Sequence, residues 1–164
     1  SGFTMTLSTP DLCDKFEGEV ATAQAQFTQY GKIAAFGGLA ETVKCFEDNS
    51  KVKQAVGEDG SGKVLVVDGG GSHRRALLGD MLAEKAISNG WAGIIVDGCV
   101  RDAAELRGTT VGIRARGTSP RRSVKRGVGE RDVPITVAGV DLVPGMWLWA
   151  DEDGIVVADR NLEA

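Results

Sequence analysis

The sequence contains few cysteines and a single histidine, and each shortage excludes a class of site. Cys13, Cys45 and Cys99 are widely spaced and form no CxxC pair, which argues against a disulfide framework and favours reduced thiols in a cytoplasmic compartment. His73 is the only histidine, and one histidine without cysteine or histidine partners makes no familiar zinc site. We therefore expect buried cysteines, and His73 at the surface or at a subunit contact.

Long apolar runs, proline and aromatic residues are also scarce. No run approaches the roughly 18 apolar residues of a membrane-spanning helix, and the first residues carry no basic-then-apolar signal for secretion. Among 164 residues there are 4 prolines, 23 glycines and 5% aromatic residues, which indicates a loop-rich globular chain with tight turns. We expect one domain at residues 8–164, preceded by a tail or expression remnant at residues 1–7.

Positive charge is concentrated in one segment. The net charge is -4, yet residues 114–131 hold seven Lys or Arg against one Glu, which leaves about −10 for the remainder of the chain. This basic run contains no aromatic residue, so it lacks the stacking surfaces of proteins that bind single-stranded nucleic acid. We expect a solvated loop or a protein contact there, and no direct binding of nucleic acid.

Two short helices are indicated in the first third of the chain. Ser8 or Thr9 precedes Pro10 and an acidic turn in STPDLCDKF (8–16), which is typical of a capped helix start. A second short helix is expected around residues 49–56.

Two apolar runs predict buried strands. KVLVVD (63–68) is continuous and β-branched, and WAGIIVD (91–97) follows it after three glycines and a stretch that permits a helix. Together they predict a strand, helix, strand unit with a parallel crossover.

The C-terminal part of the chain has a different pattern. From residue 133 apolar and polar residues alternate between turns at 138–139, 144–145 and 153–154, which is typical of a meander of hairpins. The sequence therefore predicts a mixed α/β domain with parallel and antiparallel strands.

Two polar pairs are expected at the same end of the parallel unit. Gly79-Asp80 lies within the crossover, where its helix would begin, and Arg101-Asp102 comes just after the second strand. The carboxyl ends of parallel strands are where open α/β folds bind ligands. A carboxylate and a guanidinium at that edge indicate a site for a small acid.

A helix that begins at Gly79 would shape this site further. The backbone N–H groups of Met81 and Leu82 would be unpaired and would face an anion. Arg101 could bind a carboxylate with two parallel hydrogen bonds, and Asp102 could bind a hard divalent cation through oxygen.

Each of these features also has a purely structural interpretation. Asp102-Ala-Ala-Glu105 has the spacing of a capping box, in which Asp102 accepts from the third amide of its own helix. Gly79-Asp80 could be an ordinary helix start, and Arg101 could form a structural ion pair. The glycines after residue 68 suggest a nucleotide or methyl-donor loop, but their spacing is not G-x-G-x-x-G.

Four stretches together resemble one known family, over about residues 8–160. They are STPDLCDKF (8–16), FGGLAETVKCFEDN (36–49), GKVLVVDGGGSHRRALLGDMLAEKAISNGWAGIIVDGCVRD (62–102) and GERDVPITVAGVDLVPGMWLWADEDGIVV (129–157). The family is the RraA-like family, which includes regulators of ribonuclease activity and class II 4-hydroxy-4-methyl-2-oxoglutarate aldolases. Asp80, twenty residues, Arg101-Asp102, two residues and Glu105 match the aldolase pattern.

The resemblance implies a fold, an assembly and a cofactor. The fold would be a swivelling β/β/α domain of the RraA-like type with mixed parallel and antiparallel sheets. The assembly would be a cytoplasmic homotrimer with sites between subunits, and trimers could pair into hexamers. Trp147 and Trp149 alternate along a strand and would face one way, which also favours a covering partner. The cofactor would be a divalent metal cation, Mg²⁺ or Mn²⁺.

The resemblance also implies roles for individual residues. The backbone of Gly79 to Leu82, which includes Met81, would hold the substrate, a small 2-oxo acid of the pyruvate type. Arg101 would bind its carboxylate and keto oxygen. Asp102 would be the direct metal ligand, and Asp80 would hold a water of the metal shell. Glu105 would lie outside the direct ligands and help to position them.

The implied reaction is a metal-dependent aldol cleavage, catalysed by a lyase. Cleavage of 4-hydroxy-4-methyl-2-oxoglutarate yields two pyruvates through a pyruvate enolate, which a cation and a guanidinium would stabilise. Decarboxylation of oxaloacetate passes through the same enolate, so a decarboxylase side activity is expected.

One element of the aldolase pattern has no obvious counterpart. The family's aldolases also use an acid from the C-terminal region of a neighbouring subunit, and Glu163 or the Asp151–Asp153 turn would have to supply it. The alternative function is a non-catalytic trimeric regulator, which binds and inhibits an RNase E-type ribonuclease through its surface. Some members carry the name of demethylmenaquinone methyltransferases, which the weak glycine pattern does not support.

Overall fold

The computed structural model describes residues 3–164, which form four helices and twelve strands. The helices are α1 (Thr9–Lys15), α2 (Ser50–Val56), α3 (Asp80–Ser88) and α4 (Ala103–Leu106). The strands are β1 (Val20–Thr22), β2 (Thr28–Gln29), β3 (Phe36–Lys44), β4 (Lys63–Asp68), β5 (Ala76–Leu78), β6 (Gly93–Val100), β7 (Gly112–Thr118), β8 (Glu130–Arg131), β9 (Ile135–Val137), β10 (Val140–Leu142), β11 (Trp147–Asp151) and β12 (Gly154–Ala158).

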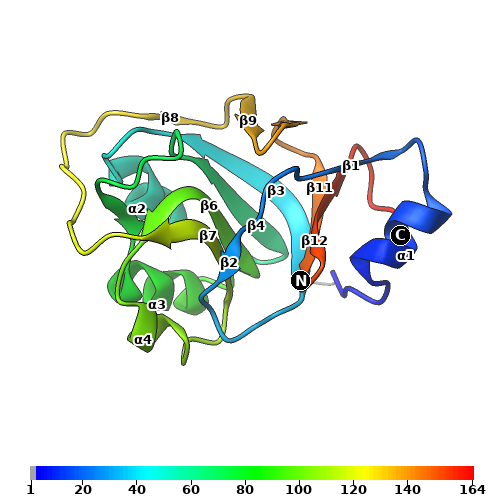
Figure 1. Ribbon diagram of the computed structural model, residues 1–164, viewed down its shortest axis with the longest axis horizontal. Coiled ribbons are helices and arrows are strands. Elements are labelled where there is room, and N and C mark those ends of the chain that lie inside the picture. The colour runs from blue at the N-terminus through cyan, green and yellow to red at the C-terminus, as the bar shows by residue number, and fades with distance from the viewer. Residues whose placement is uncertain (1–2) are drawn as a thin grey trace.

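Ten of these strands form one mixed sheet with a parallel centre (Figure 1). The strands β3, β4, β6 and β7 run parallel to one another, and β5 pairs with β6 in parallel. The strands β11, β12 and β1 extend the sheet antiparallel beyond β3, while β2 closes the other edge on β7. The hairpin of β9 and β10 forms a separate two-stranded sheet. This confirms the mixed α/β prediction.

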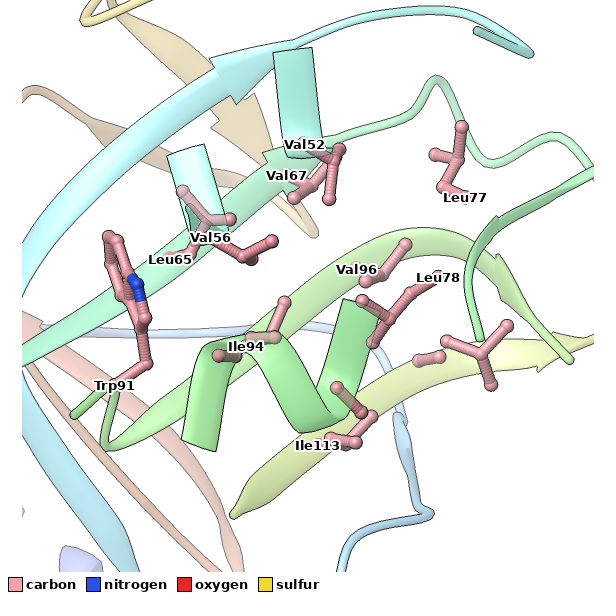
Figure 2. Packing of buried hydrophobic residues seen from close by; sticks show 14 of the residues in the cluster. Val52, Val56, Leu65, Val67, Leu77, Leu78, Trp91, Ile94, Val96 and Ile113 are labelled. Carbon is pink, nitrogen blue, oxygen red and sulfur yellow. The ribbon is translucent and has the colours of Figure 1, made fainter. Parts of the chain in front are cut away.

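Side chains of the central strands alternate between two cores. On β4, Leu65 and Val67 face the helices, whereas Val64 and Val66 face the hairpin of β9 and β10. All four are at most 2% exposed. Figure 2 shows the helix-side core, in which Val52 of α2 lies over β4. A strand that is buried on both faces needs a continuous apolar run, which explains why KVLVVD predicted this strand correctly.

The N-terminal segment covers the far end of the sheet. Leu12 of α1 packs on Trp149, which is fully buried, and Phe3 stacks on Trp147 with ring centroids 5.8 Å apart. In Figure 1, α1 lies at the opposite end of the molecule from α3 and α4. The prediction that both tryptophans need a partner is therefore wrong for Trp149, because the chain's own N-terminal segment covers it.

The observed helices and strands confirm the predicted start of the first helix and the predicted parallel strand pair, but they do not confirm one of the predicted hairpin turns. The first helix begins as expected, since the Ser8 hydroxyl accepts from the backbone N–H of Asp11 at 3.2 Å. The strand β6 is parallel to β4 as predicted. The turn at 144–145 does not join a hairpin, because β10 pairs with β9 and β11 pairs with β3 and β12.

The predicted basic loop divides into two parts. Its first part forms β7, where Arg114 is 4% exposed and donates to the backbone oxygens of Ala34 and Asp151. Residues 119–129 form the loop between β7 and β8. The prediction of a solvated loop is therefore wrong for Arg114.

Within residues 3–164 the longest helix, α3, has nine residues. No helix of this part of the chain has the length and apolar character that a membrane crossing requires.

Candidate active site

A pocket of about 180 Å³ opens where β5 ends and α3 begins. The crossover brings Gly79-Asp80 beside Arg101-Asp102, because the backbone N–H of Arg101 donates to the carbonyl of Leu78 at 2.9 Å. The predicted meeting of these two pairs is therefore confirmed. The pocket is lined by Asn49, Lys53, Ala76, Leu78, Gly79, Asp80, Met81, Leu82, Arg101, Asp102, Arg122, Ser123 and Lys125.

The Asp102 carboxylate caps the start of α3, although Asp102 itself immediately precedes α4. Its Oδ2 accepts a hydrogen bond from the backbone N–H of Asp80 at 3.0 Å, although twenty-two positions separate the two residues. A carboxylate at this place satisfies one of the free N–H groups of α3 and complements the positive end of its dipole. Asp102 thereby ties the second polar pair to the first.

The capping-box prediction for Asp102 and Glu105 is wrong. Asp102 occupies the N-cap position of α4, but its side chain makes no capping hydrogen bond there. Its backbone is left-handed, with φ 62° and ψ 43°, whereas a capping residue needs extended backbone to reach the third amide. Left-handed backbone is uncommon outside glycine and is found at functional sites. Glu105 is exposed on α4.

The two carboxyl groups influence each other strongly. A side-chain hydrogen bond with Asp102 raises the pKa of Asp80, and burial and the negative charge of Asp102 raise it further. The backbone N–H of Asp80 lowers the pKa of Asp102, and the hydrogen bond from the Asp80 side chain and the charge of Arg101 act in the same direction against burial. Asp102 is therefore the more acidic member of the pair.

The side chain of Arg101 lies beside Gly79 and lines the same pocket as Asp80 and Asp102. A Cβ at Gly79 would come 3.4 Å from its Cγ and 3.7 Å from its Nε. Among the residues that the structure describes, no carboxylate lies within ion-pair distance of its guanidinium. The structural ion pair considered from the sequence is therefore absent from residues 3–164, and the guanidinium remains available to a ligand.

Gly79 is required by the close approach of the Asp102 carboxylate. A Cβ at Gly79 would lie 2.6 Å from Oδ2 of Asp102, which is much closer than a van der Waals contact. We expect Gly79→Ala to push this carboxylate off the Asp80 amide and to lower the thermal midpoint by about 2–4 °C, as loss of a helix cap does in a chain of this size. Gly108→Ala is the matched control, because its Cβ would meet only the Glu105 carbonyl at 3.7 Å. Equal midpoints for the two variants would contradict this assignment.

The sequence did not predict the basic wall of the pocket. Lys53 comes from α2, and Arg122 and Lys125 come from the loop between β7 and β8. With Arg101 they place four cationic side chains around two carboxylates, so the pocket favours ligands that carry more than one negative charge. The basic run of residues 114–131 is the signal in the sequence for this wall, but its pattern predicts a solvated loop or a protein contact rather than a pocket.

Asn49 was also missed. It is 9% exposed, it lines the pocket, and its Oδ1 is buried without a hydrogen-bond partner within residues 3–164. A buried side-chain amide with an unpaired atom is costly. Because it lines the same pocket as Asp80 and Asp102, it is a candidate for hydrogen bonding to a ligand.

The other candidate acids lie away from this pocket. Glu163 accepts from the backbone N–H of Leu7 at 2.7 Å and from Nε1 of Trp149 at 3.0 Å, so it fixes the N-terminal segment. The turn at residues 151–153 lines a separate cavity of about 650 Å³, next to Arg114. Within the single chain neither of these acids reaches the Asp102 carboxylate.

The backbone N–H groups of the glycines after β4 are used in hydrogen bonds within the chain. The backbone N–H groups of Gly69 and Gly71 donate to the carbonyl of Asp97, and that of Gly70 donates to the Asp68 carboxylate. A phosphate-binding loop needs such groups to be free for its ligand. The next element is the strand β5 rather than a helix, which differs from the predicted order and argues further against a nucleotide loop. His73 is exposed, as expected.

Comparison with known proteins identifies the family. A family model described as RraA-like, Aldolase/RraA, matches residues 9–157. The chain belongs to the RraA-like family. Curated relatives of this RraA-like protein include one from Azotobacter vinelandii (strain DJ / ATCC BAA-1303), 52% identical over 159 residues, with 97% of this chain and 98% of the relative covered. That relative is provisionally named a 4-hydroxy-4-methyl-2-oxoglutarate aldolase.

Solved structures with the RraA-like fold carry other names. A Geobacillus kaustophilus HTA426 structure, named S-adenosylmethionine: 2-dimethylmenaquinone methyltransferase, has a TM-score of 0.94 and 46% identity over 95% of this chain and 97% of that one. A structure named the RNA-processing inhibitor RraA from Thermus thermophilis has a TM-score of 0.92 and 43% identity, with 98% and 99% of the two chains covered.

Proposed function

We propose that this RraA-like protein is a divalent-metal-dependent aldolase that cleaves 4-hydroxy-4-methyl-2-oxoglutarate to two pyruvates and also decarboxylates oxaloacetate. The observation that carries the proposal is the contact between Asp80 and Asp102 beside an unpaired Arg101, in a pocket with a basic wall. The names of curated relatives that are 52% and 53% identical support the same reaction.

The carboxylate pair fits a hard divalent cation. The backbone N–H of Asp80 donates to the Asp102 carboxylate at 3.0 Å, so the two acids lie side by side. The hydrogen bond with Asp102, burial and the charge of Asp102 raise the pKa of Asp80, and a cation bound at Asp102 would offset that charge. Within residues 3–164 there is no group of three or more potential His, Cys, Asp or Glu ligands. Mg²⁺ suits such a sparse site, because it keeps several waters and takes one or two protein carboxylates. We assign Asp102 as the direct ligand and Asp80 as the residue that orients water beside it.

The substrate is a dianion with a carboxylate at each end, and cationic side chains that line the pocket could bind both carboxylates. Arg101 and the backbone N–H of Leu82 would hold the carboxylate and keto oxygen of the pyruvyl half. Lys125 and Arg122 lie on the basic wall of the same pocket and would hold the carboxylate of the other half. This arrangement would hold the substrate with its C3–C4 bond near Asp80 and Asp102.

Charge development explains how these residues would promote cleavage. The C4 hydroxyl would pass its proton to a water that Asp80 orients, and the C3–C4 bond would break to release the first pyruvate, whose keto carbon is C4. The electron pair of that bond would pass into the enolate of the remaining fragment, C1 to C3. Arg101 stabilises the negative charge on the enolate oxygen through charge-assisted hydrogen bonds. The metal, when bound, supplies Lewis-acid stabilisation of that same oxygen. Protonation at C3 then gives the second pyruvate. Loss of CO₂ from oxaloacetate would leave the same enolate, so the same residues would serve both reactions.

Metal-dependent release of pyruvate tests the proposal. The wild-type protein is incubated with 4-hydroxy-4-methyl-2-oxoglutarate, and separately with oxaloacetate, in the presence of Mg²⁺ or Mn²⁺. Pyruvate is followed by NADH oxidation through lactate dehydrogenase. We expect turnover of both substrates and its loss in EDTA. Absence of metal-dependent turnover of either substrate would contradict the aldolase function.

We also propose that the protein acts in the cytoplasm as a homotrimer, with trimers able to pair into hexamers. Several large apolar side chains are exposed, among them Met81, Phe46 and Val128, which are 82%, 57% and 63% exposed. Met81 borders the pocket, so a neighbouring subunit that covered it could also supply the acid that the single chain lacks. Light scattering at micromolar concentration should give three or six times the chain mass. A monomer across that range would contradict this assembly.

A second candidate function is inhibition of an RNase E-type ribonuclease, which the name of the 43% identical Thermus structure favours. Such inhibition would use the surface and would persist in EDTA. Arg122 and Lys125 line the pocket, but Arg121 and Arg126 are exposed and lie outside it. Reversing charge at Arg121 and Arg126 therefore tests the surface while sparing the pocket. Inhibition that disappears with EDTA would contradict this function.

A further inference from the structure

The loop between β7 and β8 carries pocket residues but contains no helix or strand of its own. Residues 119–129 include four cationic side chains, at positions 121, 122, 125 and 126. These side chains are all exposed, and their mutual repulsion favours an open loop. Contacts with the rest of the chain must therefore hold Arg122 and Lys125 at the pocket.

The first half of the loop is held by β5 and by Glu47, which lies in the connection after β3. The backbone N–H of Ala76 donates to the carbonyl of Arg121 at 2.7 Å, and the hydroxyl of Ser123 donates back to the carbonyl of Ala76 at 2.7 Å. The backbone N–H of Val124 donates to the carbonyl of Glu47 at 3.0 Å. These contacts fix residues 121–124 through two backbone hydrogen bonds and the Ser123 hydroxyl.

The second half of the loop is held by one carboxylate. Oδ2 of Asp48 accepts from the backbone N–H groups of Arg126 at 2.8 Å and Val128 at 3.1 Å. Oδ1 accepts from the backbone N–H and hydroxyl of Ser50, at 2.9 and 2.6 Å. The Ser50 hydroxyl in turn accepts from the backbone N–H of Gly127 at 3.0 Å. Asp48 is 5% exposed and does not line the pocket.

These hydrogen bonds keep Asp48 anionic in its buried position. Burial acts to raise the pKa of Asp48, but the hydrogen bonds from Ser50, Arg126 and Val128 outweigh it and lower the pKa to about 2. Hydrogen bonds to a charged acceptor are stronger than those to a neutral one. The anionic carboxylate therefore holds residues 125–128 through two charge-assisted hydrogen bonds.

We propose that Asp48 is a positioning residue, which holds residues 125–128 so that Lys125 faces the substrate pocket. The inference rests on the proposed function, because it takes the pocket to be the binding site of a dianionic 2-oxo acid. Lys125 lies between the two attachments, with the hydrogen bonds of residues 121–124 before it and the Asp48 carboxylate after it. Loss of the carboxylate would release Lys125 while leaving Arg122 in place.

Asp48→Asn is the test variant, and Asp59→Ala is the matched control. An asparagine oxygen can still accept from Ser50, but the amide NH₂ opposes the N–H donors of Arg126 and Val128. Asp59 makes the same local contacts, since its Oδ1 accepts from the backbone N–H and hydroxyl of Ser61 at 3.0 and 2.8 Å, but it holds no distant loop. Ser50→Ala is a second variant, which removes the acceptor of the Gly127 amide and the hydroxyl that donates to Asp48 but keeps the Asp48 carboxylate, so it should act in the same direction with a smaller effect.

Limited trypsin digestion reports on the loop without requiring activity. In Asp48→Asn, cleavage after Lys125 and Arg126 should accelerate by about tenfold or more. This factor corresponds to the free energy that hydrogen bonds to a charged group contribute. Cleavage after Arg121 and Arg122 should change far less, and Asp59→Ala should behave like wild type. Unchanged cleavage after Lys125 and Arg126, or equal acceleration in the control, would overturn the proposal.

Ligand affinity and steady-state kinetics test whether release of the loop weakens substrate binding in the pocket. In Asp48→Asn, the Kd for 2-oxoglutarate measured by calorimetry and the KM for the aldol substrate should rise by about tenfold, while kcat changes by less than about threefold. Faster cleavage of the loop with unaltered Kd and KM would overturn the positioning role, and so would a wild type that does not bind 2-oxoglutarate. A wild type that binds 2-oxoglutarate without turning over either substrate would contradict the aldolase function alone, and the trypsin pattern and the Kd would then decide the role of Asp48.

Discussion

Asp102→Asn is expected to lower metal-dependent pyruvate release by on the order of a hundredfold or more. The substitution removes the negative charge that would bind the cation, yet asparagine keeps an oxygen that can accept from the Asp80 amide, where Asp102 now accepts at 3.0 Å. Asparagine also tolerates the left-handed backbone at this position better than most residues. Stability should therefore be nearly unchanged.

Two measurements on each variant separate the roles of Asp102. The thermal midpoint of Asp102→Asn should stay within about 2 °C of wild type, whereas Asp102→Ala should fall by about 2–4 °C because the start of α3 loses its acceptor. Both variants should lose the metal-dependent rate. If Asp102→Asn turned over substrate normally, Asp102 would be a structural cap for α3 and the metal assignment would be wrong.

Arg101→Lys is expected to reduce kcat/KM by about a hundredfold. Lysine keeps the positive charge, but it cannot make two parallel hydrogen bonds to a carboxylate or to the oxygens of an enolate. Because Arg101 makes no ion pair with the acids of residues 3–164, this loss should come without a fall in the thermal midpoint.

Arg107→Lys is the control for Arg101→Lys, since Arg107 is exposed just beyond α4. It should retain wild-type kinetics. A kcat/KM for Arg101→Lys within about threefold of wild type would exclude a bidentate role for Arg101.

The sequence predicted the location of the site better than its internal contacts. Asp80 and Arg101-Asp102 follow from topology, because a parallel crossover returns both pairs to one end of the sheet. The contact of Asp102 was assigned to the wrong helix. Spacing within Asp102-Ala-Ala-Glu105 carries no information on φ, and the left-handed backbone turns the carboxylate away from α4 and toward the amide of Asp80.

Other features depended on contacts distant in sequence. The central strand β3 was not predicted, since Gly37 and Gly38 argue against a strand. The structure requires small residues there, because a Cβ at Gly38 would meet the Gly62 carbonyl. Lys53 and Lys125 reach the pocket from separate elements, and no local pattern links them. Trp149 is covered by residues near the chain's N-terminus, such as Leu12, which alternation along β11 alone could not reveal.

Calorimetric titration of Mn²⁺ tests most directly whether the carboxylate pair is a metal site. Wild type and Asp102→Asn are titrated in the presence and absence of pyruvate, after both have been shown to be folded. We expect wild type to bind one Mn²⁺ per chain, more tightly with pyruvate present because the ligand adds oxygen donors to a sparse site. Asp102→Asn should bind none at this site. Equal Mn²⁺ affinity in the two proteins would contradict the metal site at Asp102.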